Sequence, residues 1–449
     1  MSGIALFLLI FALIGAFAVY TVVSIKMAAK KDCEAWVQKM WKKDSVKAIS
    51  SSVISIIFGM IIGCFILVIM LFFPSDNVQI TLNQAINGIQ LIFFGMLNTG
   101  RTGGGQLAFG FNGTSIGNML FRATPLILTG LSVALAFKTG LFNIGAPGQY
   151  LVGTAVTLIL ALSIPTSVVP SFIVWIIAFL GGILAGALWG AVPGLFKAFL
   201  NVNEVITCIM MNWIAANVVT ALFDKTIGPF KNLLDPSGTK NLAFVYKTTF
   251  NNVSTSKMGL DYIFEGSQVN GGIIIAILIA VVVYIVLNKT TFGYELKACG
   301  SNKYASKYAG INENSRIVIS MCIAGGLAGA AAALYYLSGN TEFAWETYQS
   351  LPAIGFNGIP VALLAFNNPV GVIFSSMFMS TLDVNGMQLK YMTNYNEYIT
   401  SVISALIVYF SAFSLLIKQL LSGQIKFKFN LFKKKEKTNT DLIVEEEAK

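Results

Sequence analysis

The sequence predicts an all-α polytopic membrane protein, and three observations lead to this fold class. Of its 449 residues, 55% are hydrophobic and only 11% are charged, whereas about 25% of residues in a soluble domain are charged. The apolar residues come in blocks of about 20, the length that a helix needs to cross a bilayer core. Histidine is absent, which removes the commonest general base and metal ligand. No catalytic residue, metal site or cofactor is therefore predicted.

The apolar blocks define eleven membrane-spanning segments. They are 3–25, 48–73, 119–137, 147–164, 170–196, 205–223, 270–288, 316–338, 355–367, 370–386 and 397–420. The first segment lacks the basic flank and the cleavage site of a signal peptide, so we expect a retained span. Segment 355–367 is too short to cross alone and ends at two asparagines and a proline, which favours a broken or re-entrant helix.

The basic residues indicate the orientation of these spans. With the N-terminus outside and the C-terminus in the cytoplasm, the inner segments carry 22 of the 30 basic residues and the outer segments carry 8. The net charge of +10 is therefore mainly a topology signal, and a nucleic-acid partner is not expected. The charged tail, 421–449, is expected to be solvated and to face membrane lipid.

Two spans carry glycines at intervals of four residues. Such small residues let helix backbones approach closely, which promotes helix association in lipid. We therefore assign a helix-packing role to Gly182, Gly186, Gly190, Gly325 and Gly329. The similar sequences of the two glycine stripes are compatible with an internal repeat.

Three polar segments interrupt the apolar sequence, at 136–153, 351–372 and 383–390. Non-helical backbone at membrane depth is tolerated only where protein or a water-filled cavity satisfies its polar groups. Carboxamides donate and accept hydrogen bonds without charge, which suits a neutral polar solute. The alternative is that these segments are ordinary turns at the bilayer surface. The predicted substrate-path residues are Asn143, Gln149, Asn357, Asn385 and Gln388.

The source of energy for transport is not contained in this chain. It has no phosphate-binding loop of the GxxxxGK[ST] type, and the glycine-rich stretch 99–113 lacks the required lysine. An ion-driven carrier usually embeds several carboxylates near the membrane midplane. Only Glu204, at a cytoplasmic turn, and Asp383, near a span end, are candidates, which disfavours such a carrier.

The longest inner loop, 292–316, predicts a short helix. Ser301 or Asn302 is suited to cap its N-terminus, and Gly310 is placed to end it. Lysines lie on one face, whereas tyrosines and alanines give the other side contacts suited to a groove on a soluble partner. A solvated surface helix is the alternative.

Four ordered motifs carry a resemblance to a known family. They are RATPLILTGLSVALAFKTGLFNIGAPGQ (122–149), NEVITCIMMNWIA (203–215), GYELKACGSNKYASKYAGIN (293–312) and GFNGIPVALLAFNNPVGV (355–372). From about residue 49 to 420 the chain resembles bacterial ABC importer permeases of the ribose and branched-chain amino-acid permease superfamily. It is most similar to the longer permease subunit of nucleoside importers.

The resemblance implies a type II-like permease core of about ten helices at 48–420, preceded by an extra helix and a basic linker at 1–47. It implies a bacterial cell-membrane location, a second homologous permease, a cytoplasmic ABC ATPase and an extracellular lipoprotein receptor that delivers a nucleoside. The implied ATPase-coupling residues are Gly300, Asn302, Tyr304, Ala305, Tyr308, Ala309 and Gly310.

The sequence also departs from this family. The family usually has acidic residues where Pro147 and Asn357 stand, and often a basic residue where Phe366 stands. Three alternatives therefore stay open: a permease for a simple sugar or another small polar metabolite, an ion-driven carrier, and a membrane-embedded enzyme.

Overall fold

The computed structural model describes residues 20, 39–40, 43–72, 78–224, 226–233, 241–242, 253–393, 395 and 398–421. Among these residues, seven helices are long and apolar enough to cross a membrane. They are α3 (Asp44–Phe72, apolar over Ser50–Ile69), α5 (Gly113–Lys138), α6 (Ala146–Ser163), α7 (Ser171–Leu200), α8 (Glu204–Leu222), α10 (Gly272–Lys289) and α13 (Glu313–Tyr336). The protein is therefore an all-α polytopic membrane protein, as its sequence predicts.

The remaining described elements are shorter or more polar. The helices are α4 (Val78–Phe94), η1 (Gly95–Leu97), η2 (Lys231–Leu233), α9 (Leu260–Ile263), α11 (Thr291–Ser301), α12 (Lys303–Tyr308), α14 (Ala353–Leu364), α15 (Pro369–Met392), α16 (Tyr398–Ala412) and α17 (Ser414–Leu421). Strands β1 (Asn98–Arg101) and β2 (Leu107–Phe109) form one antiparallel pair, and β3 (Asn241–Leu242) and β4 (Phe343–Ala344) form another.

The predicted spans agree with the described helices, with three differences. Helix α4 was not predicted, because Gln and Asn residues interrupt its apolar sequence. The predicted segment 397–420 is divided into α16 and α17. Helix α15 continues to Met392, six residues beyond the predicted end. The predicted span 3–25 and nearly all of the tail 421–449 lie outside the described residues.

The short helix expected at 355–367 is present as α14, which has 12 residues. Behind it, Phe366 and Asn367 adopt positive φ angles of 49° and 56°, a left-handed conformation that asparagine tolerates better than most residues. This turn ends α14, and Asn368 then caps α15 by accepting a hydrogen bond from the amide of Val370 at 3.0 Å. The break is therefore built from local backbone geometry, and it reverses the chain before α15.

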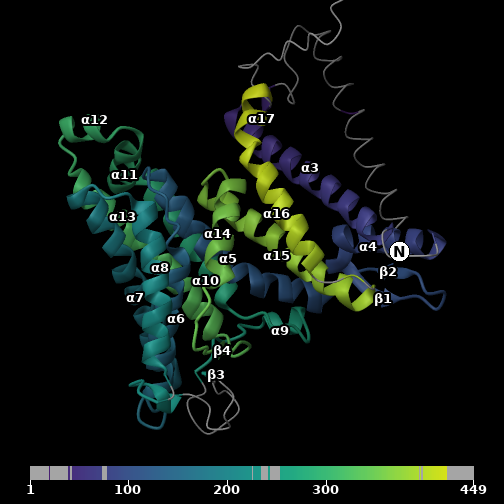
Figure 1. Cartoon of the computed structure of the whole chain (residues 1–449), viewed down its shortest axis with the longest axis horizontal. Coiled ribbons are helices and arrows are strands. Elements are labelled where there is room, and N and C mark those ends of the chain that lie inside the picture. The colour runs from purple at the N-terminus through teal and green to yellow at the C-terminus, as the bar shows by residue number, and fades with distance from the viewer. Residues whose placement is uncertain are drawn as a thin grey trace, which may run out of the picture.

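The helices place the short elements at two opposite ends of the molecule. Figure 1 shows α11, α12 and α17 at the upper end, and the β3–β4 pair at the lower end. Helices α14 and α15 pack against α5, and α16 packs against α3, α14 and α15 (Figure 1).

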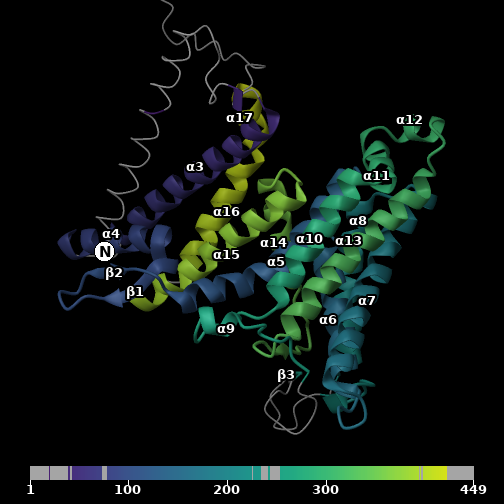
Figure 2. The ribbon, with the colours of Figure 1, turned by 180° about the vertical axis from the view of Figure 1, so that it is seen from behind.

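The two glycine stripes face each other. Helices α7 and α13 run side by side (Figure 2). A Cβ atom on Gly186 would collide with the carbonyl oxygen of Gly325 and would lie 2.9 Å from Cα of Gly329. A Cβ on Gly190 would lie 2.5 Å from the carbonyl oxygen of Met321. Only glycine permits this backbone contact, which supplies close van der Waals packing between the helices.

Candidate functional site

The polar break in the apolar sequence lies between α5 and α6. Helix α5 ends at Lys138, and Gly140 turns the chain with a φ angle of 72°. Helix α6 then begins at Ala146 with Pro147 in its first turn, where the fixed φ of proline suits a helix start and its missing N–H costs nothing. Irregular backbone is therefore confined to residues 139–145.

Two buried carboxamide side chains stabilise this break by hydrogen bonding to each other. The Asn143 side chain donates to Oε1 of Gln149 at 2.8 Å, and Gln149 donates back to Oδ1 of Asn143 at 3.0 Å. Asn143 also donates to the hydroxyl of Ser132 at 3.0 Å and accepts from the amide of Gly145 at 3.2 Å. Asn143 is 0% exposed and Gln149 is 1% exposed. The pair satisfies buried polar groups that would otherwise be costly.

A third carboxamide, Asn212 of α8, completes the network. It accepts from the amide of Gly148 at 2.9 Å and donates to the carbonyl of Ile144 at 3.0 Å. Sequence reasoning did not single out Asn212. The feature of the sequence that could have identified it is its position in motif 203–215, where polar residues interrupt an apolar segment.

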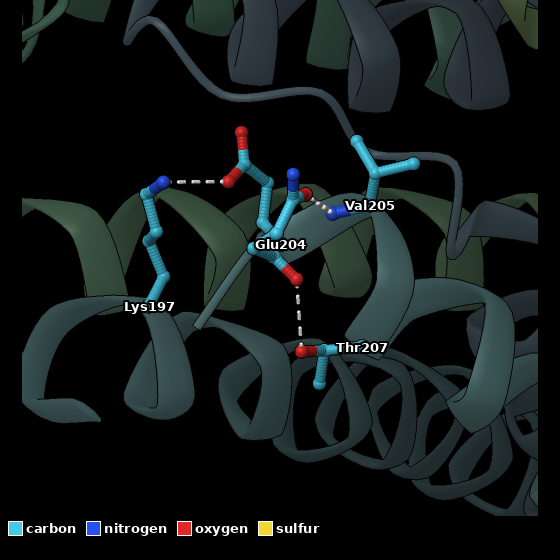
Figure 3. Close-up of polar contacts among 5 residues, drawn as sticks. Lys197, Glu204, Val205 and Thr207 are labelled. Atoms are coloured by element: carbon cyan, nitrogen blue, oxygen red, sulfur yellow. Dashed lines mark hydrogen bonds and ion pairs between the residues drawn. The ribbon is translucent and has the colours of Figure 1, made fainter. Parts of the chain in front are cut away.

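The start of α8 is a second polar cluster, shown in Figure 3. The carboxylate of Glu204 lies 2.8 Å from Nζ of Lys197. Asn203 accepts from the amide of Val205 at 2.8 Å, and the hydroxyl of Thr207 donates to the Asn203 carbonyl at 3.1 Å. Glu204 is therefore engaged in an ion pair at the turn that joins α7 to α8.

Two glycine contacts connect the break to other elements. A Cβ on Gly140 would lie 2.8 Å from Cα of Gly300, which belongs to α11. A Cβ on Gly355, near the start of α14, would lie 2.5 Å from Cα of Pro147. The predicted path segments around Pro147 and Gly355 are thus in direct backbone contact, and α11 abuts the same break from the other side.

A cavity of about 340 Å³ lies between α5, α14, α15 and α16. Its apolar lining includes Leu126, Phe356, Pro360 and Met379. Its polar lining consists of Asn357, Asp383, Ser401 and Ser404. The volume is at the low end of the roughly 300–1,000 Å³ typical of small-molecule sites, and the mixture of apolar walls with a few polar groups is also typical of them.

The five predicted path residues are therefore distributed over three places. Only Asn357 lines the cavity. Asn143 and Gln149 form the buried pair. Asn385 is buried and donates to the carbonyl of Ile92 at 2.6 Å, and Gln388 donates to the hydroxyl of Ser115 at 3.2 Å and accepts from Asn98 at 3.2 Å. A path role for the residues outside the cavity stays a prediction.

The α11–α12 segment contains the short helix that the sequence predicts. Asn302, and not Ser301, caps α12 by accepting from the amide of Ala305 at 3.0 Å. Gly310 follows with a φ angle of 80°. Tyr304 is 78% exposed and Tyr308 is 95% exposed. Two aromatic side chains therefore stand in solvent on a capped helix.

Ion pairs fix this segment to α13. Lys303 lies 3.6 Å from Glu313, and Arg316 pairs with Glu295 of α11. The guanidinium of Arg316 also lies 5.1 Å from the ring centroid of Phe292, within the range of a cation–π contact. These contacts therefore connect α11 and α12 to α13.

Comparison with known proteins identifies the family of this chain. A family model described as "Branched-chain amino acid transport system / permease component" matches residues 115–412, well over half of the chain. The chain is 34% identical over 313 residues to the guanosine ABC transporter permease protein NupP of Bacillus subtilis, which covers 70% of this chain and 85% of that protein.

Two further relatives match over similar lengths. The chain is 33% identical over 374 residues to the nucleoside ABC transporter permease protein NupB of Lactococcus lactis, covering 82% of this chain and 92% of that protein. It is 29% identical over 298 residues to the glucose ABC transporter permease protein TsgB13 of Haloferax volcanii, covering 65% and 74%. No solved structure matches. By the matched residues and the extent of these similarities, the chain belongs to the permease family of branched-chain amino acid transport systems.

Proposed function

We propose that this chain is the transmembrane permease subunit of an ATP-driven importer and forms the path for nucleosides. The observation that carries the proposal is the similarity of most of the chain to two permeases named for nucleoside or guanosine transport. The cavity supports it, because its apolar walls and four polar side chains suit a neutral solute with both an aromatic and a hydroxylated part.

A simple sugar is the second candidate solute. The similarity to a glucose permease favours it, at 29% identity. Serine, asparagine and aspartate side chains in the cavity could hydrogen-bond a sugar as well as a ribose. The exposed aromatic ring of Phe356 favours a nucleoside, because a base can stack on it.

ATP hydrolysis is assigned to a separate cytoplasmic ABC ATPase. We infer that the ATPase docks on the α11–α12 segment, where two exposed tyrosines stand beside a helix held by ion pairs. A lipid-anchored extracellular receptor would deliver the solute to the opposite end. Several residues of α14, α15 and α16 that line the cavity are exposed, so this chain does not enclose the cavity on that side. A second, homologous permease would cover this side and complete the path.

The orientation in the membrane is also a proposal, and it can be tested by labelling. Ser254 and Ser301 are both exposed. Thr255, the neighbour of Ser254, binds the carbonyl of Leu337 just after the end of α13, whereas α11, which ends at Ser301, pairs with Arg316 near the start of α13. In a background without native cysteines, an impermeant thiol reagent should label Ser254→Cys in intact cells and Ser301→Cys only after permeabilisation. Labelling of both positions in intact cells would contradict an outer N-terminus and an inner α11–α12 segment.

Removal of this chain tests the proposed function directly. Cells that lack it should lose uptake of radiolabelled guanosine, and the native chain should restore that uptake. Unlabelled nucleosides should compete with guanosine, whereas glucose should not. Loss of glucose uptake with normal guanosine uptake would favour the sugar permease instead.

A further inference from the structure

Among the described residues, none binds the four polar side chains that line the cavity. In the described part of the chain, no hydrogen bond or ion pair engages Asn357, Asp383, Ser401 or Ser404. By contrast, the amide nitrogens of Asn143, in the break between α5 and α6, and of Asn385, in α15, donate to protein groups. Polar groups at membrane depth are costly unless they are satisfied, so these four are suited to bind water or a solute.

Asp383 is the one ionisable residue among the described residues that line the cavity. It is the fifteenth residue of the 24-residue helix α15. Its side chain is exposed to the space between the helices. A carboxylate within a membrane span is expensive, and such residues mark functional sites more often than structural ones.

Arg122 of α5 lies within electrostatic range of Asp383. The guanidinium attracts the carboxylate electrostatically, yet among the described residues the two groups form no ion pair. Arg122 instead donates to the sulfur of Met387 at 3.6 Å, one helical turn beyond Asp383, and sulfur is a weak acceptor. The oxygens of Asp383 therefore remain available to a solute.

We propose that Asp383 determines solute specificity by accepting hydrogen bonds from two vicinal hydroxyl groups, as on the ribose of a nucleoside. This inference rests on the proposed function and adds the residue that selects the solute. An ionised carboxylate has two acceptor oxygens and no donor, so it can accept a hydrogen bond from each hydroxyl group of a vicinal diol. A 2′,3′-dideoxy sugar lacks both of these hydroxyl groups. Phe356, on the facing helix α14, supplies an apolar surface for the base.

The test compares a nucleoside that lacks the diol with one that keeps the diol and lacks a different hydroxyl group. Guanosine uptake by cells containing the complete transporter is measured in competition with 2′,3′-dideoxyguanosine, and with 5′-deoxyguanosine, which keeps the diol. A hydrogen bond to a charged group is worth roughly a factor of ten or more in binding. We therefore expect the dideoxy compound to compete about tenfold or more weakly than 5′-deoxyguanosine.

Three variants then decide the role of Asp383. Asp383→Asn should still transport but should reduce that preference to about two- to threefold, because a neutral amide accepts more weakly than a carboxylate. Asp383→Glu, which keeps the carboxylate, should retain most of the preference. Glu265→Gln, which removes a negative charge from an exposed outer loop residue, should leave the preference unchanged.

Two results would overturn the proposal. One is an unchanged diol preference in Asp383→Asn. The other is complete loss of uptake in both Asp383 variants with the complex present at native abundance, which would show a structural role. If the native complex failed to take up any nucleoside, the proposed function would fail instead, and the same variants would be compared on glucose and its deoxy analogues.

Discussion

Replacing Asn143 with leucine should destabilise the folded permease more than any other single exchange of a carboxamide discussed above. The change leaves the Gln149 carboxamide and the amide of Gly145 without the partners they have in the native network, and it removes the hydrogen bond that the hydroxyl of Ser132 accepts. Each buried polar group left unsatisfied costs about 1–3 kcal/mol. No water is available to replace the lost bonds at a site that is 0% exposed.

Thermal unfolding of the detergent-purified complex measures this effect. The matched control is Asn217→Leu on α8, because Asn217 is exposed and donates only to a carbonyl of its own helix, that of Trp213. Asn143→Leu should unfold at a clearly lower temperature than the native chain, and Asn217→Leu should not. A native unfolding temperature combined with altered guanosine uptake would mean that Asn143 contacts the solute, as the sequence alone predicted.

Replacing both Tyr304 and Tyr308 with aspartate should abolish uptake by removing the ATPase from the complex. These side chains are 78% and 95% exposed, so the folded permease should tolerate the change. At a docked interface the two new carboxylates would be buried without partners. Loss of an aromatic anchor alone costs about 2 kcal/mol or more, equivalent to at least about a tenfold loss of affinity for each residue.

Co-purification of the ATPase with an affinity-tagged permease is the direct measurement. The amount of ATPase recovered should fall in parallel with uptake, while the abundance of the permease in the membrane stays native. Tyr262→Asp is the matched control, since Tyr262 is 85% exposed but lies in α9, away from α11 and α12. Full recovery of the ATPase with the double variant would show that docking uses another surface.

The contacts described above connect the α11–α12 segment to the cavity. Gly300 of α11 lies against Gly140, and the break that follows Gly140 is held by the Asn143–Gln149 pair. Pro147, in the first turn of α6, lies against Gly355 at the start of α14. Helix α14 in turn contributes Phe356 and Asn357 to the cavity. Each step is a direct packing or hydrogen-bond contact, the physical basis that coupling between distant sites requires.

The sequence alone determined the helical class, the position of most spans and the helix-packing glycines. These features depend on properties that extend over a whole segment, such as an apolar length of about 20 residues or a four-residue glycine interval. The cap of α12 was also predictable, because an asparagine binds the amide three residues later in the same segment. Helix α4 escaped prediction because Gln and Asn residues interrupt its apolar sequence.

Only the tertiary structure decided which polar residues line a cavity and which bind the protein. Asn143 and Asn357 are chemically identical and both interrupt apolar sequence, yet one is paired with Gln149 and buried, and the other lines a cavity. Asp383 and Arg122 are 261 positions apart in the sequence, and they interact electrostatically because α5 and α15 pack together. Local sequence encodes what a side chain can bind, whereas the packing of distant helices determines which of its partners is within reach.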